Sequence, residues 1–155
     1  MKIKAILLVF IFIIISSFLF SILSSKTNTQ NNKIFYVESF IKAIKDQLVP
    51  PATIVKDHLK ISKDTVKSGY YPQIITQLLE VRRDISAARA EELEITPYKE
   101  LPEKEQTIVM APDASENVFI VKYHGKKVMS VMVGQNKITA FKTLVEGPKE
   151  VFIAL

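Results

Sequence analysis

The sequence predicts an α+β protein: an N-terminal transmembrane helix, then helices packed on a curved antiparallel sheet of four to five strands. Three observations lead to this fold class. An uncharged apolar run occupies residues 5–23. Apolar residues then recur every three or four positions, the period of an amphipathic helix, as far as residue 93. From residue 106 short alternating runs are separated by turn residues, which is typical of strands.

The first segment is predicted to hold the protein at a membrane. As a helix, residues 5–23 would be about 29 Å long, close to the thickness of a bilayer core. Lys2 and Lys4 precede it, so the positive-inside rule keeps the N-terminus in the cytoplasm and sends the remainder across. The run is longer than the apolar part of a signal peptide and lacks a clear small-residue cleavage site. We therefore expect an uncleaved anchor, with a secreted domain as the alternative if cleavage occurs.

The chain divides into three parts on this basis: a signal-anchor segment over residues 1–25, a polar linker over 26–33 and an α+β domain over 34–155. Without Lys2 and Lys4 the sequence has 19 basic and 16 acidic residues, with the two signs interspersed. Such a balance argues against nucleic-acid binding, which needs a concentrated basic face. The absence of cysteine excludes disulfides, thiolate metal sites and a cysteine nucleophile.

Three helices are predicted. The first covers residues 34–48, with Asn32 as its N-cap and Pro50 beyond its end. A short second helix follows over residues 52–59, although residues 59–61 fit a short alternating strand equally well. The third covers residues 72–93. The apolar face of the first is Ile34, Val37, Ile41, Ile44 and Leu48, and that of the third is Ile74, Leu78, Val81, Ile85 and Ala88. Two i, i+3 ion pairs are expected on the outside of the third helix: Glu80 with Arg83, and Arg89 with Glu92.

A polar, proline-containing connection follows, and then the strands. Gly125 and Lys126 are predicted to form a tight hairpin turn, and Gly147 with Pro148 to end the fourth strand. The second strand is apolar at successive positions, which indicates a sheet covered on both faces: curved around a helix, lining a pocket or forming a dimer interface. The predicted strands cover residues 106–111, 118–124, 127–133, 138–145 and 151–155.

The run VFIVKYHGKKVMSVMVGQNKITAFKTL at residues 118–144 resembles the end of a nuclear transport factor 2-like domain, the cone-shaped, cystatin-like superfold. The resemblance covers at most residues 34–155 and rests on periodicity. Small exported bacterial members have a long helix before a strand hairpin, as predicted here. The family has a strand between its second and third helices, where this chain has only residues 59–69. Isomerases, dehydratases, binding modules and accessory domains share this superfold, so the resemblance implies a fold and no single activity.

No catalytic residue, cofactor or metal site is predicted. Ser39 and Lys42 match the S-x-x-K pair of penicillin-recognising enzymes, but its partner motifs are missing and the domain is too small. His58 and His124 are separate and lack a third ligand, so they do not indicate zinc. If the fold is a cone with a pocket, the residues expected near its mouth are Tyr70, Tyr71, Tyr123 and Arg82.

The sequence therefore predicts a membrane-anchored, extracytoplasmic accessory or binding domain that acts through an unknown protein partner or through self-association, without catalysis. One alternative is a cone-fold domain that binds or turns over a small molecule in an apolar pocket. The other is a single-span structural subunit of an envelope complex. A filled concave face favours protein binding, and an open cavity with converging polar groups favours a small ligand.

Overall fold

The structure is a computed structural model that describes residues 29–62, 65, 69–153 and 155. The chain divides into two compact units, Met1–Asn32 and Lys33–Leu155, and the second contains both sheets. The predicted membrane segment at residues 5–23 lies outside the described residues. Within the described ranges, no helix is both long and apolar enough to cross a membrane.

Three α-helices precede the strands in the described part of the chain: residues 29–45, α2 (Pro51–His58) and α4 (Tyr71–Asp84). The first begins earlier than predicted, so Asn32 lies inside the helix and is not its N-cap. It also ends three residues early, and Leu48, predicted on its apolar face, is 90% exposed in the turn before the prolines. The rest of that face is on the core side: Val37, Ile41 and Ile44 are buried, and Ile34 packs half-buried against the main core.

The third helix ends at Asp84, nine residues before its predicted end. Ile85 and Ala88 keep the apolar spacing and are buried, but they lie in turns, and the Lys45 ammonium group donates to both of their carbonyls. Two apolar residues that are buried from turns therefore have the same sequence spacing as the buried face of a helix. A 3-10 turn, η1 (Ala90–Glu92), follows. It is stabilised by the predicted Arg89–Glu92 ion pair, whose guanidinium donates to Oε1 at 2.9 Å.

The predicted Glu80–Arg83 pair is not formed. Arg83 instead bonds its neighbour Asp84 at 3.2 Å, and Glu80 pairs with Lys142. Both changes follow from tertiary structure, since Lys142 comes from a segment that packs beside α4. The i, i+3 rule considers only residues of the same helix, so it does not predict a partner from another segment.

The larger sheet has the strand order β1-β3-β4-β5 and is antiparallel throughout. Its first strand, β1, lies in a stretch predicted as helix end and polar connection, and pairs with β3 from Leu93↔Tyr123 to Pro97↔Phe119. The hairpin between β3 and β4 turns at His124 and Gly125, one residue before the predicted turn, and both have positive φ (48° and 73°), as a two-residue hairpin requires. The strands are β1 (Leu93–Pro97), β3 (Val118–Tyr123), β4 (Lys126–Val133) and β5 (Ile138–Ala140).

A second sheet, not predicted as separate, has the order β2-β7-β6. The predicted strand 138–145 is divided: β5 ends at Ala140, the buried Phe141 anchors the crossing, and β6 starts the second sheet. Gly147 has φ 64° in the turn that joins β6 to β7. The pairing of β2 with β7 is parallel. The strands are β2 (Ile108–Val109), β6 (Thr143–Glu146) and β7 (Lys149–Phe152).

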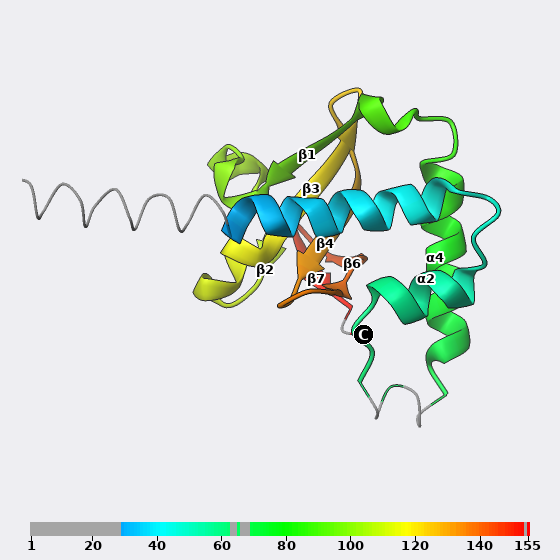
Figure 1. Cartoon of the computed structure of the whole chain (residues 1–155). Helices are drawn as coiled ribbons and strands as arrows, with labels where there is room; N and C mark the ends of the chain where they lie inside the picture. The colour runs from blue at the N-terminus through cyan, green and yellow to red at the C-terminus, as the bar shows by residue number, and fades with distance from the viewer. Residues whose placement is uncertain (1–28, 63–64, 66–68, 154) are drawn as a thin grey trace, which may run out of the picture. The chain divides into compact units, whose positions relative to one another are not determined.

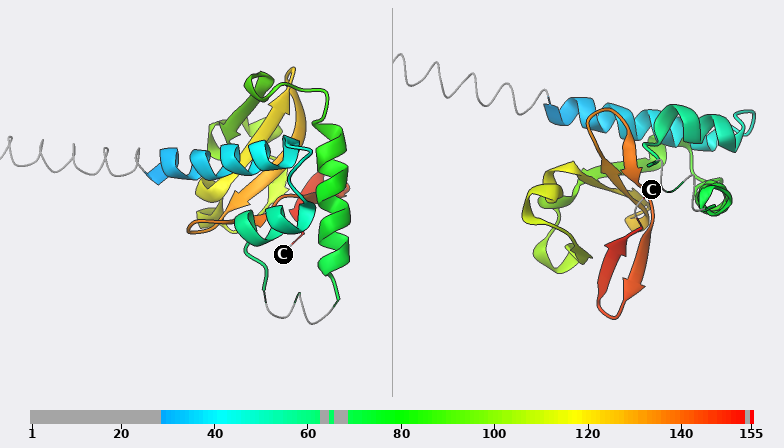
Figure 2. Two further views of the ribbon diagram at one scale, coloured as in Figure 1. Left: turned by 45° about the vertical axis from the view of Figure 1, so that its right-hand side comes forward. Right: turned by 90° about the horizontal axis from the view of Figure 1, so that it is seen from below.

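The two faces of the larger sheet are covered differently, as Figures 1 and 2 show. The three helices cover one face, where Phe119, Val121 and Val131 contribute to the main core. The other face carries a smaller cluster in which Val118 and Ile120 meet Tyr98, Leu101 and Ile108. The residues that meet β3 here come from a 3-10 turn (Tyr98), from the position just after it (Leu101) and from β2 (Ile108), with Phe152 of β7 packed against the cluster. The α+β class is confirmed, and the second apolar face is covered by the protein's own chain.

Candidate functional site

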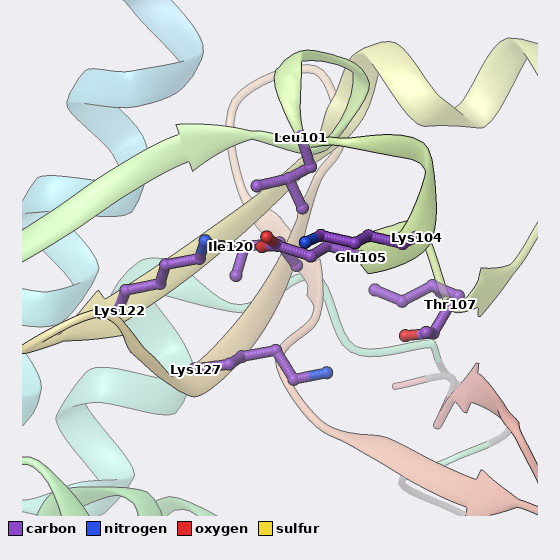
Figure 3. A pocket seen from close by; sticks show the side chains of 9 residues that line it. Leu101, Lys104, Glu105, Thr107, Ile120, Lys122 and Lys127 are labelled. Atoms are coloured by element: carbon purple, nitrogen blue, oxygen red, sulfur yellow. Dashed lines mark hydrogen bonds and ion pairs between the residues drawn. The ribbon is translucent and has the colours of Figure 1, made fainter.

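A cavity of about 300 Å³ opens where the β3–β4 hairpin faces the 3-10 turn η3 (Glu103–Glu105). Three lysines line it: Lys104 on η3, Lys122 at the end of β3 and Lys127 at the start of β4. Figure 3 shows their side chains around one space, with Glu105 between Lys104 and Lys122. Its apolar wall consists of Leu101, Ile108 and Ile120, all buried. We call this space the lysine cavity.

The β3–β4 hairpin places two of these lysines together. Lys122 follows Ile120 by two positions in the same strand, so both side chains leave the same face of the sheet. A register shift after Val121 makes Lys127 the Cα partner of Lys122. Their side chains are only 18% and 35% exposed, so both amines act near an apolar surface. Two ammonium groups held side by side there need anionic partners.

Glu105 is the partner of Lys122, with Nζ and Oε2 2.8 Å apart. This hydrogen bond, and then the lysine charge, hold the pKa of Glu105 below its ordinary value of 4.5. Lys104 forms no ion pair with any residue that the structure describes. The cavity thus contains one paired and one unpaired ammonium group close to a single exposed carboxylate.

Glu150 on β7 neutralises Lys127 and connects the two sheets. Its Oε1 accepts from Lys127 and from the Thr107 hydroxyl at 3.0 Å, and its Oε2 accepts from the Thr143 hydroxyl at 2.6 Å. Burial raises the pKa of this carboxyl, but the hydrogen bonds from Lys127, Thr143 and Thr107 together outweigh burial and lower it. Both oxygens are occupied, so Glu150 has a structural role and Lys127 is held by it.

Replacing Glu150 by glutamine is expected to destabilise the domain most at neutral pH. Because the folded-state pKa lies below 4.5, the stability contributed by the carboxylate is complete above about pH 4.5 and is lost as the pH falls through the folded value. The difference in unfolding free energy between wild type and Glu150→Gln should therefore be constant above about pH 5 and shrink as the pH falls from about 5 to about 3. Urea denaturation at each pH measures it. A difference that is constant over this range would contradict an ionised, paired Glu150.

Two further cavities flank the sheets. One, of about 430 Å³, is mainly apolar and contacts Ile61, Met132, Phe152 and Leu155. The other, of about 180 Å³, lies between α4 and β4, beside the Lys142–Glu80 pair. Ser130 lines it with a buried hydroxyl that has no hydrogen-bond partner within the described residues. A cavity of this size has room for several waters, which is sufficient to satisfy that hydroxyl.

Besides the cavities, the β6–β7 hairpin is a second candidate binding surface. It projects away from the helices in the right-hand view of Figure 2. Strand β6 is an edge of its sheet, and its two central residues, Leu144 and Val145, are 54% and 76% exposed. On the opposite edge, Val109 of β2 is 49% exposed. Neighbouring apolar residues on an exposed edge strand are unusual in a monomer, since such an edge invites pairing with another chain.

The residues predicted near a pocket mouth do not come together in these cavities. Arg82 is buried, and its guanidinium donates to the carbonyls of Ile44 at 2.7 Å and Val49 at 2.9 Å. Tyr70 is exposed ahead of α4, and Tyr71 packs half-buried against the main core. Tyr123 contacts His124 at the hairpin tip, with ring centroids 4.2 Å apart and the two ring planes tilted. None of the four lines any of the three cavities described, and a pocket-lining role for them stays a prediction.

The lysines were not singled out in the sequence, although a signal existed: Lys122 and Lys127 flank a predicted hairpin turn. His58 is half-buried beside Phe40, and burial lowers its pKa more than Asp57 raises it. His124 is exposed in the turn, as predicted. Over the described residues, no three histidine, aspartate or glutamate side chains are grouped so that they could hold a metal ion.

Comparison of the chain with protein-family models, with curated proteins and with solved structures gave no significant match. Any function must therefore be argued from the geometry of the cavities and of the exposed strand.

Proposed function

We propose that residues 33–155 form a non-catalytic binding domain that recognises a protein partner through strand β6. The observation that carries this proposal is the exposure of Leu144 and Val145 on an edge strand. An edge strand has unpaired backbone groups along one side, and an extended segment of a partner can add to it as a further strand. The two apolar side chains would contribute burial to that contact.

The position of β6 supports this role. Its inner edge is fully paired with β7, from Thr143↔Phe152 to Glu146↔Lys149, so the strand is held in an extended form before any partner arrives. Glu150 ties β7 to β4 through Lys127, which braces the projecting hairpin against the larger sheet. A strand that is ordered in advance loses little conformational entropy on binding. A partner segment of extended, apolar character is therefore the occupant that we propose.

We further propose that residues 5–23 anchor the domain on the outer side of a membrane. This rests on the uncharged run and on Lys2 and Lys4 before it. The nuclear transport factor 2-like assignment is also a proposal. One feature favours it: the backbone N–H of Lys60 donates to the carbonyl of Ile138 at 2.8 Å, so a strand-like contact exists between the second and third helices, where that family has a strand. An experimentally determined structure that fails to superpose on such a domain would refute the assignment.

The test is site-specific photocrosslinking in the full chain, expressed in its native membrane. Carbonate washing must first leave the chain in the membrane pellet, and release into the supernatant would refute the anchor. A photoreactive residue in place of Val145 should give one discrete adduct. The matched control is the same residue in place of Val109, which is also exposed and apolar but lies on the opposite edge of that sheet.

A second substitution, Leu144→Lys, should abolish the Val145 adduct because it places a charge in the proposed contact. An adduct with twice the mass of the chain would assign β6 to self-association. No adduct from position 145, or the same adducts from positions 145 and 109, would contradict recognition through β6.

A further inference from the structure

We infer that the lysine cavity is a binding site for a small organic anion, a carboxylate that carries a short apolar or aromatic group. The site is separate from β6, so it does not depend on the proposed function above. Its charge is the first reason. Glu150 is fully engaged by Lys127, Thr107 and Thr143, which leaves Lys104 and Lys122 facing the single carboxylate of Glu105. The cavity therefore has an excess of one positive charge.

The position of Glu105 is the second reason. Its carboxylate already occupies the place next to Lys122 that a ligand would take, which shows that this amine is accessible to an anion at hydrogen-bond distance, 2.8 Å. Glu105 lies on a three-residue 3-10 turn and is 39% exposed, whereas Lys122 is only 18% exposed. Ion pairs with an exposed partner contribute little net stability, so exchange of Glu105 for a ligand carboxylate costs little.

The apolar wall is the third reason, and it decides the class of anion. Leu101, Ile108 and Ile120 line the cavity next to the amines, and Figure 3 shows Leu101 and Ile120 on the side where Lys122 ends. An inorganic anion would satisfy the lysines but leave this wall in contact with water. A volume of about 300 Å³ is at the lower end of small-molecule sites. A compact amphipathic carboxylate uses both the charge and the wall.

The experiment uses the full chain in lipid nanodiscs, with isothermal titration of sodium benzoate, benzyl alcohol and inorganic phosphate. Benzoate should bind, and benzyl alcohol, which has the same ring without the charge, should bind at least tenfold more weakly, as expected for loss of a charge-assisted hydrogen bond. Phosphate alone should also bind more weakly than benzoate. Binding of phosphate but not benzoate would overturn the inference, as would equal binding of benzoate and benzyl alcohol.

Three variants test the roles of the side chains. Glu105→Gln removes the competing carboxylate and should tighten benzoate binding about two- to fivefold, the range of an exposed ion pair. This gain is the sharpest sign, because damage to the structure would weaken binding. Lys122→Met should weaken binding at least tenfold. Lys104→Met removes an exposed amine that makes no ion pair in the described structure, so it should weaken binding without affecting folding even if Lys122→Met does not fold.

The control is Lys99→Met, which removes an exposed lysine outside the cavity and should leave the affinity unchanged. Any of three results would overturn the assignment of this cavity. These are unchanged or weaker benzoate binding in Glu105→Gln, unchanged binding in Lys104→Met, and a loss of affinity in Lys99→Met as large as that in Lys104→Met.

Discussion

Replacing Arg82 by methionine is expected to lower the free energy of unfolding by about 2–4 kcal/mol, since two charge-assisted hydrogen bonds are lost. Arg82 is 8% exposed, and it donates to the carbonyls of Ile44 and Val49 near the end of the first helix. The last carbonyls of a helix have no partner within it. Methionine keeps the apolar stem but removes the donor of the buried Ile44 carbonyl and of the partly buried Val49 carbonyl.

Arg83 offers a matched control because it is the next residue on the same helix. Its side chain is 77% exposed and, among the described residues, forms an ion pair only with the exposed Asp84. Arg83→Met should therefore change stability by less than about 0.5 kcal/mol. Urea denaturation of the full chain in detergent, followed by tyrosine fluorescence, compares the two variants. Similar losses for Arg82→Met and Arg83→Met would show that Arg82 does not cap the first helix.

Phe141→Ala should have the largest effect, a loss of about 3–5 kcal/mol, the usual cost of truncating a buried phenylalanine. Phe141 is 1% exposed and packs edge to face on Phe40, with ring centroids 5.7 Å apart. It also lies where the chain passes from β5 to β6. Truncation therefore leaves a cavity in the main core and removes the anchor of the crossing between the sheets.

The control for this prediction is Phe35→Ala, which removes the same side chain from a place where it is 63% exposed on the first helix. Its loss should be below about 1 kcal/mol. The same denaturation measurement applies, and Phe141→Leu should fall between the two because it retains most of the volume. A loss for Phe141→Ala no larger than that for Phe35→Ala would contradict its place in the core.

The predicted order of helices before strands is correct because it depends on local periodicity, although β1 was not predicted as a strand. Apolar residues at helical spacing located the first and third helices, and Pro51 marked the start of the second. Short apolar runs around turn residues located β3 and β4. The boundaries were less accurate, since several other arrangements give the same spacing. Ile85 and Ala88 are buried from turns, and Leu93 belongs to a strand although it follows a helical pattern. The spacing of apolar residues reports which positions are buried. Because an irregular segment can also be buried, this spacing does not fix where a helix ends.

The lysine cavity and the role of Arg82 could not be predicted in this way. Lys104 meets Lys122 only because the 3-10 turn before β2 folds over the β3–β4 hairpin, a contact between segments 18 positions apart in sequence. Arg82 occurs on a helix that carries charges of both signs, where a neighbouring arginine, Arg83, is exposed. Nothing in the local pattern distinguishes the buried arginine from the exposed one.

By itself, the sequence determined the α+β class, the order of helices before strands, the turn near Gly125 and the uncharged run at residues 5–23, because each depends on residues close together in the chain. Only the tertiary structure decided that residues 138–145 divide between two sheets, that Arg82 caps a helix, and that three lysines converge on an apolar wall. These features depend on which distant segments pack together, and a local pattern of apolar and polar residues does not specify that packing.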